Sequence, residues 1–125
     1  MIAKIWHKIW NALNYIWGWL QWGSRNRLRR LKNVHKGKRC FVIGNGPSLC
    51  NADLIHLNKC GEYTLACNSL IKLFNEIPFY PTYYFAQDNK IILDNINEIK
   101  ELKGERFIKA HYAKRYHIKG VTYYS

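Results

Sequence analysis

The stretch from Arg39 to Leu49, RCFVIGNGPSL, constrains the fold of this chain more than any other. Its residues 40–43 form a short apolar run typical of a buried strand, and the run ends abruptly at Gly44. A glycine there permits a tight turn or the close approach of a ligand, because a side chain would obstruct either. Ser48 follows as a candidate helix cap. The pattern therefore predicts a strand, a glycine loop and a helix start in direct succession.

This succession favours anion binding. It places free backbone N–H groups and the positive end of a helix dipole at one point, which suits the phosphates of a nucleotide. Asn45 and Ser48 can add side-chain hydrogen bonds. The loop lacks the third glycine of a dinucleotide fingerprint, since Leu49 stands there, and it lacks the Lys-Ser/Thr pair of a P-loop. The pattern alone thus leaves an ordinary turn as an equal alternative.

Beyond the loop, the sequence alternates between strand and helix patterns. We expect helices at 51–57, at 69–74 and from the N-cap Asp88 to about 102, and strands at 63–67, 82–86, 106–110 and 121–124. Strands separated by helical segments indicate an α/β fold, a Rossmann-like parallel sheet with right-handed crossovers. We expect an amphipathic N-terminal helix to precede this sheet, and the pattern leaves open whether the sheet is complete at its C-terminal end.

Ligands of open α/β sheets bind beyond the carboxyl ends of the strands. The residues in those positions here are Gly44 to Ser48, Asn68 and Ser69, and Gln87 to Asn89. Asn68 stands where dinucleotide folds commonly place the acid that binds ribose, and its amide can both donate and accept. Asp88 can bind a hydroxyl or a metal, or it can serve only as the helix cap.

Residues 2–22 are predicted to form an amphipathic helix. Its apolar stripe consists of Ile2, Ile5, Trp6, Ile9, Trp10, Leu13, Ile16, Trp17 and Leu20. Trp19 and Trp22 lie off the stripe, and indole rings are favoured at a membrane–water boundary. The uncharged part, 9–23, is 15 residues, short of the ~20 needed to span a bilayer. We expect a helix on a membrane surface. Packing against its own domain or a partner, and an inserted or signal segment, are the alternatives.

Positive charge is concentrated at the start of the chain. Residues 1–40 hold 10 Lys/Arg and no Asp/Glu, whereas 41–125 hold 10 Lys/Arg and all 8 Asp/Glu. A basic run after an aromatic amphipathic helix suits anionic lipid head groups. A solvated charged helix is one alternative; nucleic acid is another, although no recognisable DNA- or RNA-binding module follows. The predicted membrane contacts are Trp6, Trp10, Trp17, Trp19, Trp22, Arg25, Arg29 and Arg30.

These patterns divide the chain into a membrane-binding arm, 1–35, and a nucleotide-binding domain, 36–125. We expect a cytoplasmic protein that is peripheral on the inner face of the membrane. The cysteines, Cys40, Cys50, Cys60 and Cys67, are too far apart for a Cys-x-x-Cys metal knuckle, so we interpret them as reduced thiols and expect no metal site.

Three stretches resemble the MptE-like domain, named after the archaeal 6-hydroxymethylpterin diphosphokinase. They are 36–49 (KGKRCFVIGNGPSL), Cys67-Asn68 and 81–88 (PTYYFAQD), and the resemblance covers about residues 36–110. The domain also occurs in many bacterial proteins tied to surface-sugar and flagellin glycosylation. The string GNGPSL further resembles the start of bacterial sialyltransferases that use a CMP-activated sugar.

The resemblance implies roles for particular residues. In those sialyltransferases the Asn and Ser of the loop and an Asn after the second strand contact the nucleotide, which implies the same for Asn45, Ser48 and Asn68. MptE-like proteins tend to have an acidic residue followed by Asp-Pro where this chain has Gln-Asp-Asn, so only Asp88 carries over. The implied nucleotide-binding residues are Gly44, Asn45, Gly46, Ser48, Asn68 and Asp88.

No catalytic residue is assigned. The sialyltransferases place their catalytic His and a tyrosine pair well beyond the first three strands, and neither His111 nor His117 maps onto that His. We therefore expect residues 36–125 to be the N-terminal part of a larger transferase domain.

The function that the resemblance implies is that of a membrane-associated transferase domain. It would bind a nucleotide-activated donor, a nucleotide sugar for surface glycans, as a substrate and without a tightly bound cofactor. One alternative is a pterin diphosphokinase that uses ATP and Mg²⁺, with Asp88 as the metal ligand. Another is a non-catalytic membrane-bound module or an inactive truncated relative.

Overall fold

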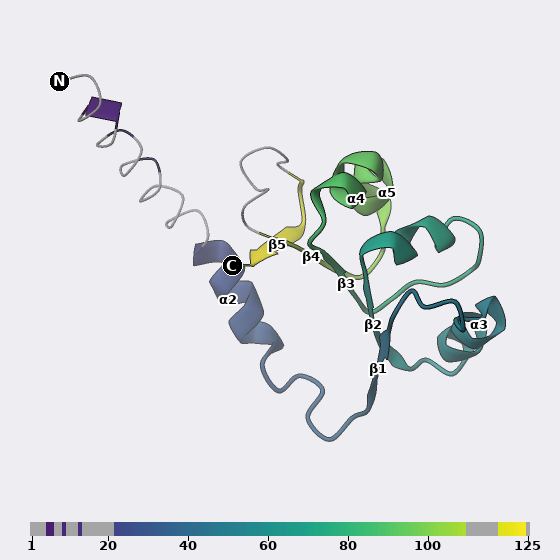
Figure 1. The fold of residues 1–125 in the computed structure, drawn as a ribbon. Coiled ribbons are helices and arrows are strands. Elements are labelled where there is room, and N and C mark those ends of the chain that lie inside the picture. The colour runs from purple at the N-terminus through teal and green to yellow at the C-terminus, as the bar shows by residue number, and fades with distance from the viewer. Residues whose placement is uncertain (1–4, 7–8, 10–12, 14–21, 110–117, 125) are drawn as a thin grey trace.

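The computed structural model describes residues 5–6, 9, 13, 22–109 and 118–124. Five strands form one all-parallel sheet in the order β1-β2-β3-β4-β5 (Figure 1). The strands are β1 (Cys40–Ile43), β2 (Tyr63–Cys67), β3 (Tyr83–Ala86), β4 (Glu105–Lys109) and β5 (Val121–Tyr124). The helical segments are α2 (Trp22–Leu31), α3 (Asn51–Lys59), the 3-10 helix η1 (Asn68–Leu73), α4 (Asn89–Asp94) and α5 (Ile96–Glu101). The predicted α/β, Rossmann-like class is confirmed.

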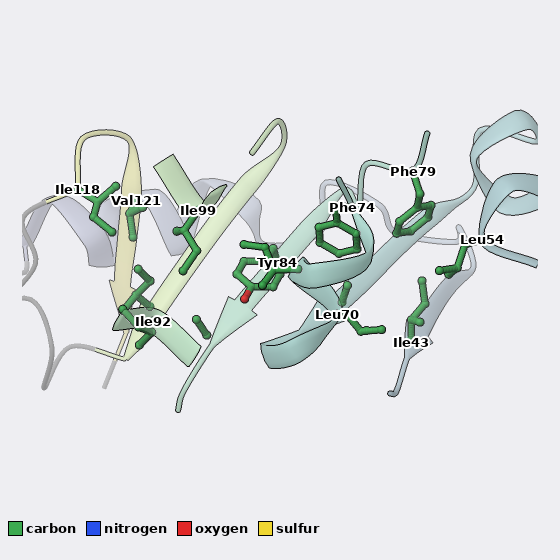
Figure 2. Packing of buried hydrophobic residues seen from close by; sticks show 14 of the residues in the cluster. Ile43, Leu54, Leu70, Phe74, Phe79, Tyr84, Ile92, Ile99, Ile118 and Val121 are labelled. Carbon is green, nitrogen blue, oxygen red and sulfur yellow. The ribbon is translucent and has the colours of Figure 1, made fainter. Parts of the chain in front are cut away.

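One face of the sheet carries the main hydrophobic core. Strand pairing aligns Ile43 with Ala66 and Ala66 with Tyr84, so these three side chains point to the same face. They are buried in one cluster with apolar side chains of the helical segments (Figure 2), among them Leu54, Leu70, Ile71, Ile92 and Ile99. Burial of these side chains is the main stabilising contribution to the domain.

The predicted helix from Asp88 to about 102 is wrong in one respect, because it is two helices. Asn95 separates α4 from α5 with φ −128° and ψ 31°, and its side-chain Nδ2 donates to Ile91 O at 2.8 Å. Asparagine competes in this way with backbone hydrogen bonding. Ile92 and Ile99 are nevertheless both fully buried, so the break turns the chain while both short helices stay on the core.

The second helix that differs from its prediction follows β2. The expected helix at 69–74 is a 3-10 helix, and it begins directly after β2. Leu70 and Ile71 bring it onto the core, and both are about 1% exposed. A short 3-10 helix is therefore enough to bury these two side chains.

The opposite face of the sheet is rich in aromatic side chains. The rings of Phe85 and Phe107 stack at 4.5 Å between centroids and 11° between planes. The His35 ring lies 3.8 Å from that of Tyr63, and His35 Nε2 lies 2.6 Å from the Tyr83 hydroxyl. His35 thereby fastens the segment between α2 and β1 to this face.

Helix α2 packs against β5. Ser24 Oγ accepts a hydrogen bond from Tyr123 N at 3.1 Å, and Arg27 Nη1 donates to Gly120 O at 3.1 Å. Arg27 Nε also lies 3.9 Å from a carboxylate oxygen of Glu105. The basic segment after residue 21 is thus in contact with the sheet.

Candidate functional site

The carboxyl ends of β1, β2 and β3 lie at one edge of the sheet. The parallel register pairs Ile43 with Ala66 and Cys67 with Phe85, so the residues that follow each strand come close to one another. Those residues are the glycine loop after β1, Asn68 and Ser69 after β2, and Gln87 and Asp88 after β3. This edge is the one predicted to bind ligands.

The glycine loop, 44–48, does not need glycine for its own conformation. Neither Gly44 nor Gly46 has a positive φ. A Cβ on Gly44 would meet no atom within 4 Å, and one on Gly46 would lie at an ordinary 3.9 Å from Ser48 Oγ. The prediction that a side chain at Gly44 would obstruct the turn is therefore wrong. Close approach of a ligand is the remaining reason that the sequence offered for glycine here.

Ser48 is not the predicted helix cap. It lies in a turn closed by a hydrogen bond from Leu49 N to Gly46 O at 3.1 Å. Helix α3 begins after Cys50, whose side chain makes no capping hydrogen bond. Asp53 stands in the first turn of α3, where its negative charge offsets the helix dipole. The helix therefore attracts an anion less strongly than the sequence pattern predicted.

Asn45 links the glycine loop to the end of β2. Its Nδ2 donates to Ser69 Oγ at 2.6 Å. Both side chains keep further hydrogen-bonding capacity, because the amide oxygen accepts and the serine hydroxyl can also donate. The contact brings Ser69, which the resemblance did not include, into the same site.

Asn68 joins the ends of β2 and β3. It adopts the left-handed conformation, φ 49°, and its Oδ1 accepts from Gln87 N at 3.0 Å and from Asp88 N at 3.4 Å. Asparagine tolerates this backbone conformation better than most residues. Since the oxygen already holds two backbone groups, the Nδ2 donor is the part of this side chain best placed to contact a ligand.

Asp88 is the N-cap of α4, as predicted. Its Oδ1 accepts from Lys90 N at 2.8 Å and from Ile91 N at 3.2 Å. Those two bonds take up part of the acceptor capacity that a metal ion would need. Within the described residues, no group of three or more His, Cys, Asp or Glu side chains could hold a metal ion.

Two tyrosines were missed by the sequence analysis. The Tyr84 hydroxyl donates to Asn68 O at 2.8 Å, and burial raises the pKa of Tyr84. Burial also raises the pKa of Tyr124, at the end of β5. Both hydroxyls therefore remain protonated at neutral pH and act as donors, not as bases. Tyr84 therefore holds the backbone of Asn68 in place. This contact depends on the register between β2 and β3, so no pattern in the sequence indicates it.

One further polar atom near this edge lacks a partner. Asn89 Oδ1 is buried and has no hydrogen-bond partner among the described residues. A buried polar group without a partner costs about 1–3 kcal/mol. A ligand or water at this edge would offset that cost.

Two surface hollows lie elsewhere. One of about 320 Å³ lies between η1 and α5, with Phe74, Tyr80 and Leu102 in its lining. The other, of about 510 Å³, lies at the amino end of β1 and β2 and includes Arg39 and Glu62. Neither hollow includes a predicted nucleotide-binding residue.

The predicted membrane contacts are only partly described. Residues 5, 6, 9 and 13 are helical, and the side chains of Ile5, Trp6, Ile9 and Leu13 are exposed, Trp6 at 67%. Arg25, Arg29 and Arg30 of α2 are also exposed. Trp10, Trp17 and Trp19 lie outside the described residues, as do His111, His117 and the side chain of Trp22. Among the helices that are described, none has the length and apolar character to cross a bilayer.

Comparison with protein-family models, with curated proteins and with solved structures finds no match.

Proposed function

We propose that the carboxyl edge of β1, β2 and β3 binds a nucleotide-activated donor, as the MptE-like resemblance implies. The observation that carries this proposal is the pair of side-chain links across the three strand ends. Asn45 contacts Ser69, and Asn68 contacts the backbone of Gln87 and Asp88. These links put the residues implied for nucleotide binding at one edge and hold their polar groups in fixed positions.

The uncharged polar side chains at this edge suit binding of a nucleotide without a metal ion. Amide and hydroxyl groups of Asn45, Ser69 and Asn68 can hydrogen-bond a ribose, a base edge or a phosphate oxygen. The open loop at Gly44 and Gly46 lets a phosphate approach the backbone closely. A nucleotide sugar of a surface-glycan transferase is therefore our first candidate. Because Asp88 is engaged as a cap, a diphosphokinase that needs ATP and Mg²⁺ is the second.

A thermal-shift panel on the full chain tests this proposal. CMP, CDP, UDP, GDP and ATP would each be added with and without Mg²⁺. We expect a cytidine or uridine nucleotide to raise the melting temperature without metal. A shift with ATP only in the presence of Mg²⁺ would favour the diphosphokinase, and no shift from a cooperatively folded sample would favour a non-catalytic module.

Asn45→Ala is the variant for this panel. We expect it to abolish the nucleotide-dependent shift, since it removes the link between the loop and β2. Asn75→Ala is the matched control, because Asn75 is exposed and lines the hollow beside η1, away from the strand ends. Equal shifts for both variants would contradict the site.

We further propose that the N-terminal helix binds an anionic membrane surface. Four apolar side chains at residues 5, 6, 9 and 13 are exposed, and three arginines of α2 are exposed close by in the sequence. Such a combination of apolar and basic residues binds lipid through burial and electrostatic attraction together.

Vesicle sedimentation tests the membrane proposal. We expect the full chain to bind vesicles that contain an anionic lipid, and binding to weaken with salt. Deletion of residues 1–21 should abolish binding while it keeps α2, which contacts β5. Equal binding by the truncated chain would contradict the proposal.

A further inference from the structure

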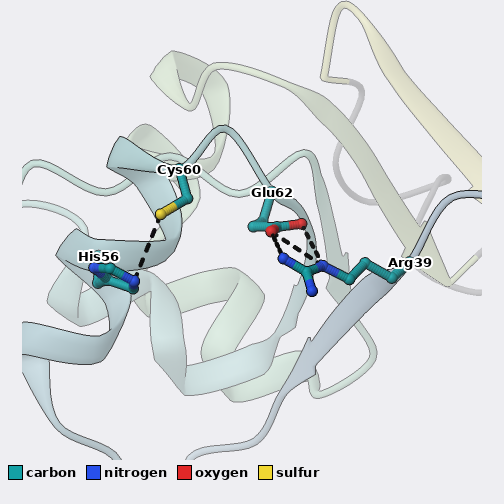
Figure 3. Close-up of polar contacts among 4 residues, drawn as sticks. All are labelled: Arg39, His56, Cys60 and Glu62. Carbon is teal, nitrogen blue, oxygen red and sulfur yellow. Dashed lines mark hydrogen bonds and ion pairs between the residues drawn. The ribbon is translucent and has the colours of Figure 1, made fainter.

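Helix α3 presents a cysteine and a histidine side by side near its carboxyl end. His56 and Cys60 are one helical turn apart, and Cys60 Sγ lies 3.5 Å from His56 Nε2 (Figure 3). Both residues are exposed. The pair lies on the outer surface of α3, apart from the strand ends that form the candidate nucleotide site.

The distance between the two atoms is close to the distance between two ligands of one zinc ion. Zinc–sulfur bonds are about 2.3 Å and zinc–nitrogen bonds about 2.0–2.1 Å, so a tetrahedral site separates sulfur from nitrogen by roughly 3.6 Å. A regular helix holds residues i and i+4 on one face. Neither side chain therefore needs to move far to bind the ion.

A carboxylate close to the pair is already engaged by a cation. Arg39 binds the carboxylate of Glu62, and its Nε donates to both oxygens at 3.1 Å (Figure 3). Glu62 is therefore held by Arg39 and is not one of the two side chains of the pair. Zinc would replace the thiol proton, which passes to solvent.

We propose that His56 and Cys60 are one half of a zinc site, and that the same pair of a second copy of this chain supplies the other half. Structural zinc takes four ligands, and among the described residues no cluster of three or more His, Cys, Asp or Glu is present. Two exposed pairs related by a two-fold axis give a Cys₂His₂ site. Its two thiolates neutralise the charge of Zn²⁺.

Zinc titration of the reduced full chain tests this proposal. We expect one ion to bind per two chains and the molecular mass, measured by light scattering, to double relative to the metal-free sample. Substitution with Co²⁺ should give the thiolate-to-metal charge-transfer band and the strong visible bands of a tetrahedral site.

Three variants decide the outcome. His56→Ala and Cys60→Ser should each abolish zinc-dependent doubling and the Co²⁺ bands, without a change in the circular dichroism spectrum, because both residues are exposed. Cys50→Ser is the matched control, since Cys50 is also exposed but lies at the other end of α3, and it should behave as the parent chain. Zinc binding that survives Cys60→Ser would overturn the proposal, and so would one ion per chain with no change in mass.

Discussion

The two outer strands of the sheet, β5 and β1, differ in whether another element covers their outer edge. At β5, Ser24 of α2 accepts a hydrogen bond from Tyr123 N, and Arg27 donates one to the oxygen of Gly120, the residue before the strand. Along β1, no strand pairs with the outer edge within the described residues, and Phe41 and Val42 are 38% and 76% exposed. The prediction of a buried strand at 40–43 is therefore wrong except at Ile43, because this strand lies at the open edge of the sheet. The β5 edge is covered by α2, a helix distant from it in sequence, and the β1 edge is open.

The difference suggests that one edge contributes mainly to stability and the other mainly to ligand binding. The covered edge belongs to the buried part of the sheet, where Val121 and Phe107 are nearly inaccessible. The open edge carries the glycine loop, in which no glycine is required by the protein's own backbone. Stability should therefore depend on the β5 side, and ligand binding on the β1 side. Four experiments test this contrast.

The largest effect is expected at Gly104, the residue before β4. Gly104 has φ 94°, and a Cβ there would lie 2.5 Å from Pro81 O. Gly104→Ala should lower the free energy of unfolding by about 3 kcal/mol or more, because the backbone of Pro81 cannot yield easily. Urea denaturation measures this, with Gly44→Ala as the control, which should change stability by less than about 0.5 kcal/mol. Equal losses would remove the contrast.

A matched pair of valines gives the next effect. Val121 of β5 is 8% exposed, whereas Val42 of β1 is the most exposed apolar strand residue described. Val121→Ala should cost about 2 kcal/mol through lost burial and a small cavity. Val42→Ala should cost little, and denaturant midpoints of the two variants compare them directly. A large loss for Val42→Ala would mean that the open edge is covered in solution.

Removal of the α2 contact should have a smaller effect. Ser24→Ala deletes the acceptor for Tyr123 N and should lower stability by about 1 kcal/mol. The control is Arg25→Ala, one residue along α2, whose exposed side chain should contribute less than about 0.5 kcal/mol. If thermal melts place both variants at the parent midpoint, the helix does not stabilise the covered edge.

The smallest effect on stability is expected at the open edge itself. Val42→Lys introduces a charge on an exposed strand and should leave the melting temperature nearly unchanged. Because a charged side chain discourages strand pairing between molecules, concentration-dependent light scattering should fall. Scattering equal to that of the parent chain would show that the β1 edge plays no part in self-association.

Local patterns in the sequence predicted most strands and one helix cap. The run 121–124 is a strand with the expected bounds, and Asp88 caps α4 because Asp accepts from the N–H groups of a first helical turn. These features depend on neighbours in sequence. They are therefore visible in the chain itself.

Features set by distant contacts could not be predicted in this way. The break at Asn95, the left-handed Asn68 and the packing of α2 on β5 all depend on which segments meet in space. Ser48 was predicted to cap a helix because its residue type suits a cap, yet the turn at 47–48 places the helix start two residues later. The candidate site was located at the strand ends by topology, but its internal links were not.

The strand order has a consequence for how the chain assembles. Each strand pairs with the strand that precedes it in the sequence, so the sheet can grow one strand at a time as the polypeptide leaves the ribosome. The exception is α2, whose hydrogen bonds to Gly120 and to Tyr123 of β5 join residues 93 and 99 positions apart. Helix α2 is synthesised early but can pack against the sheet only after β5 has formed. Until then, the newest strand of the growing sheet has an edge whose backbone N–H and C=O groups are unpaired.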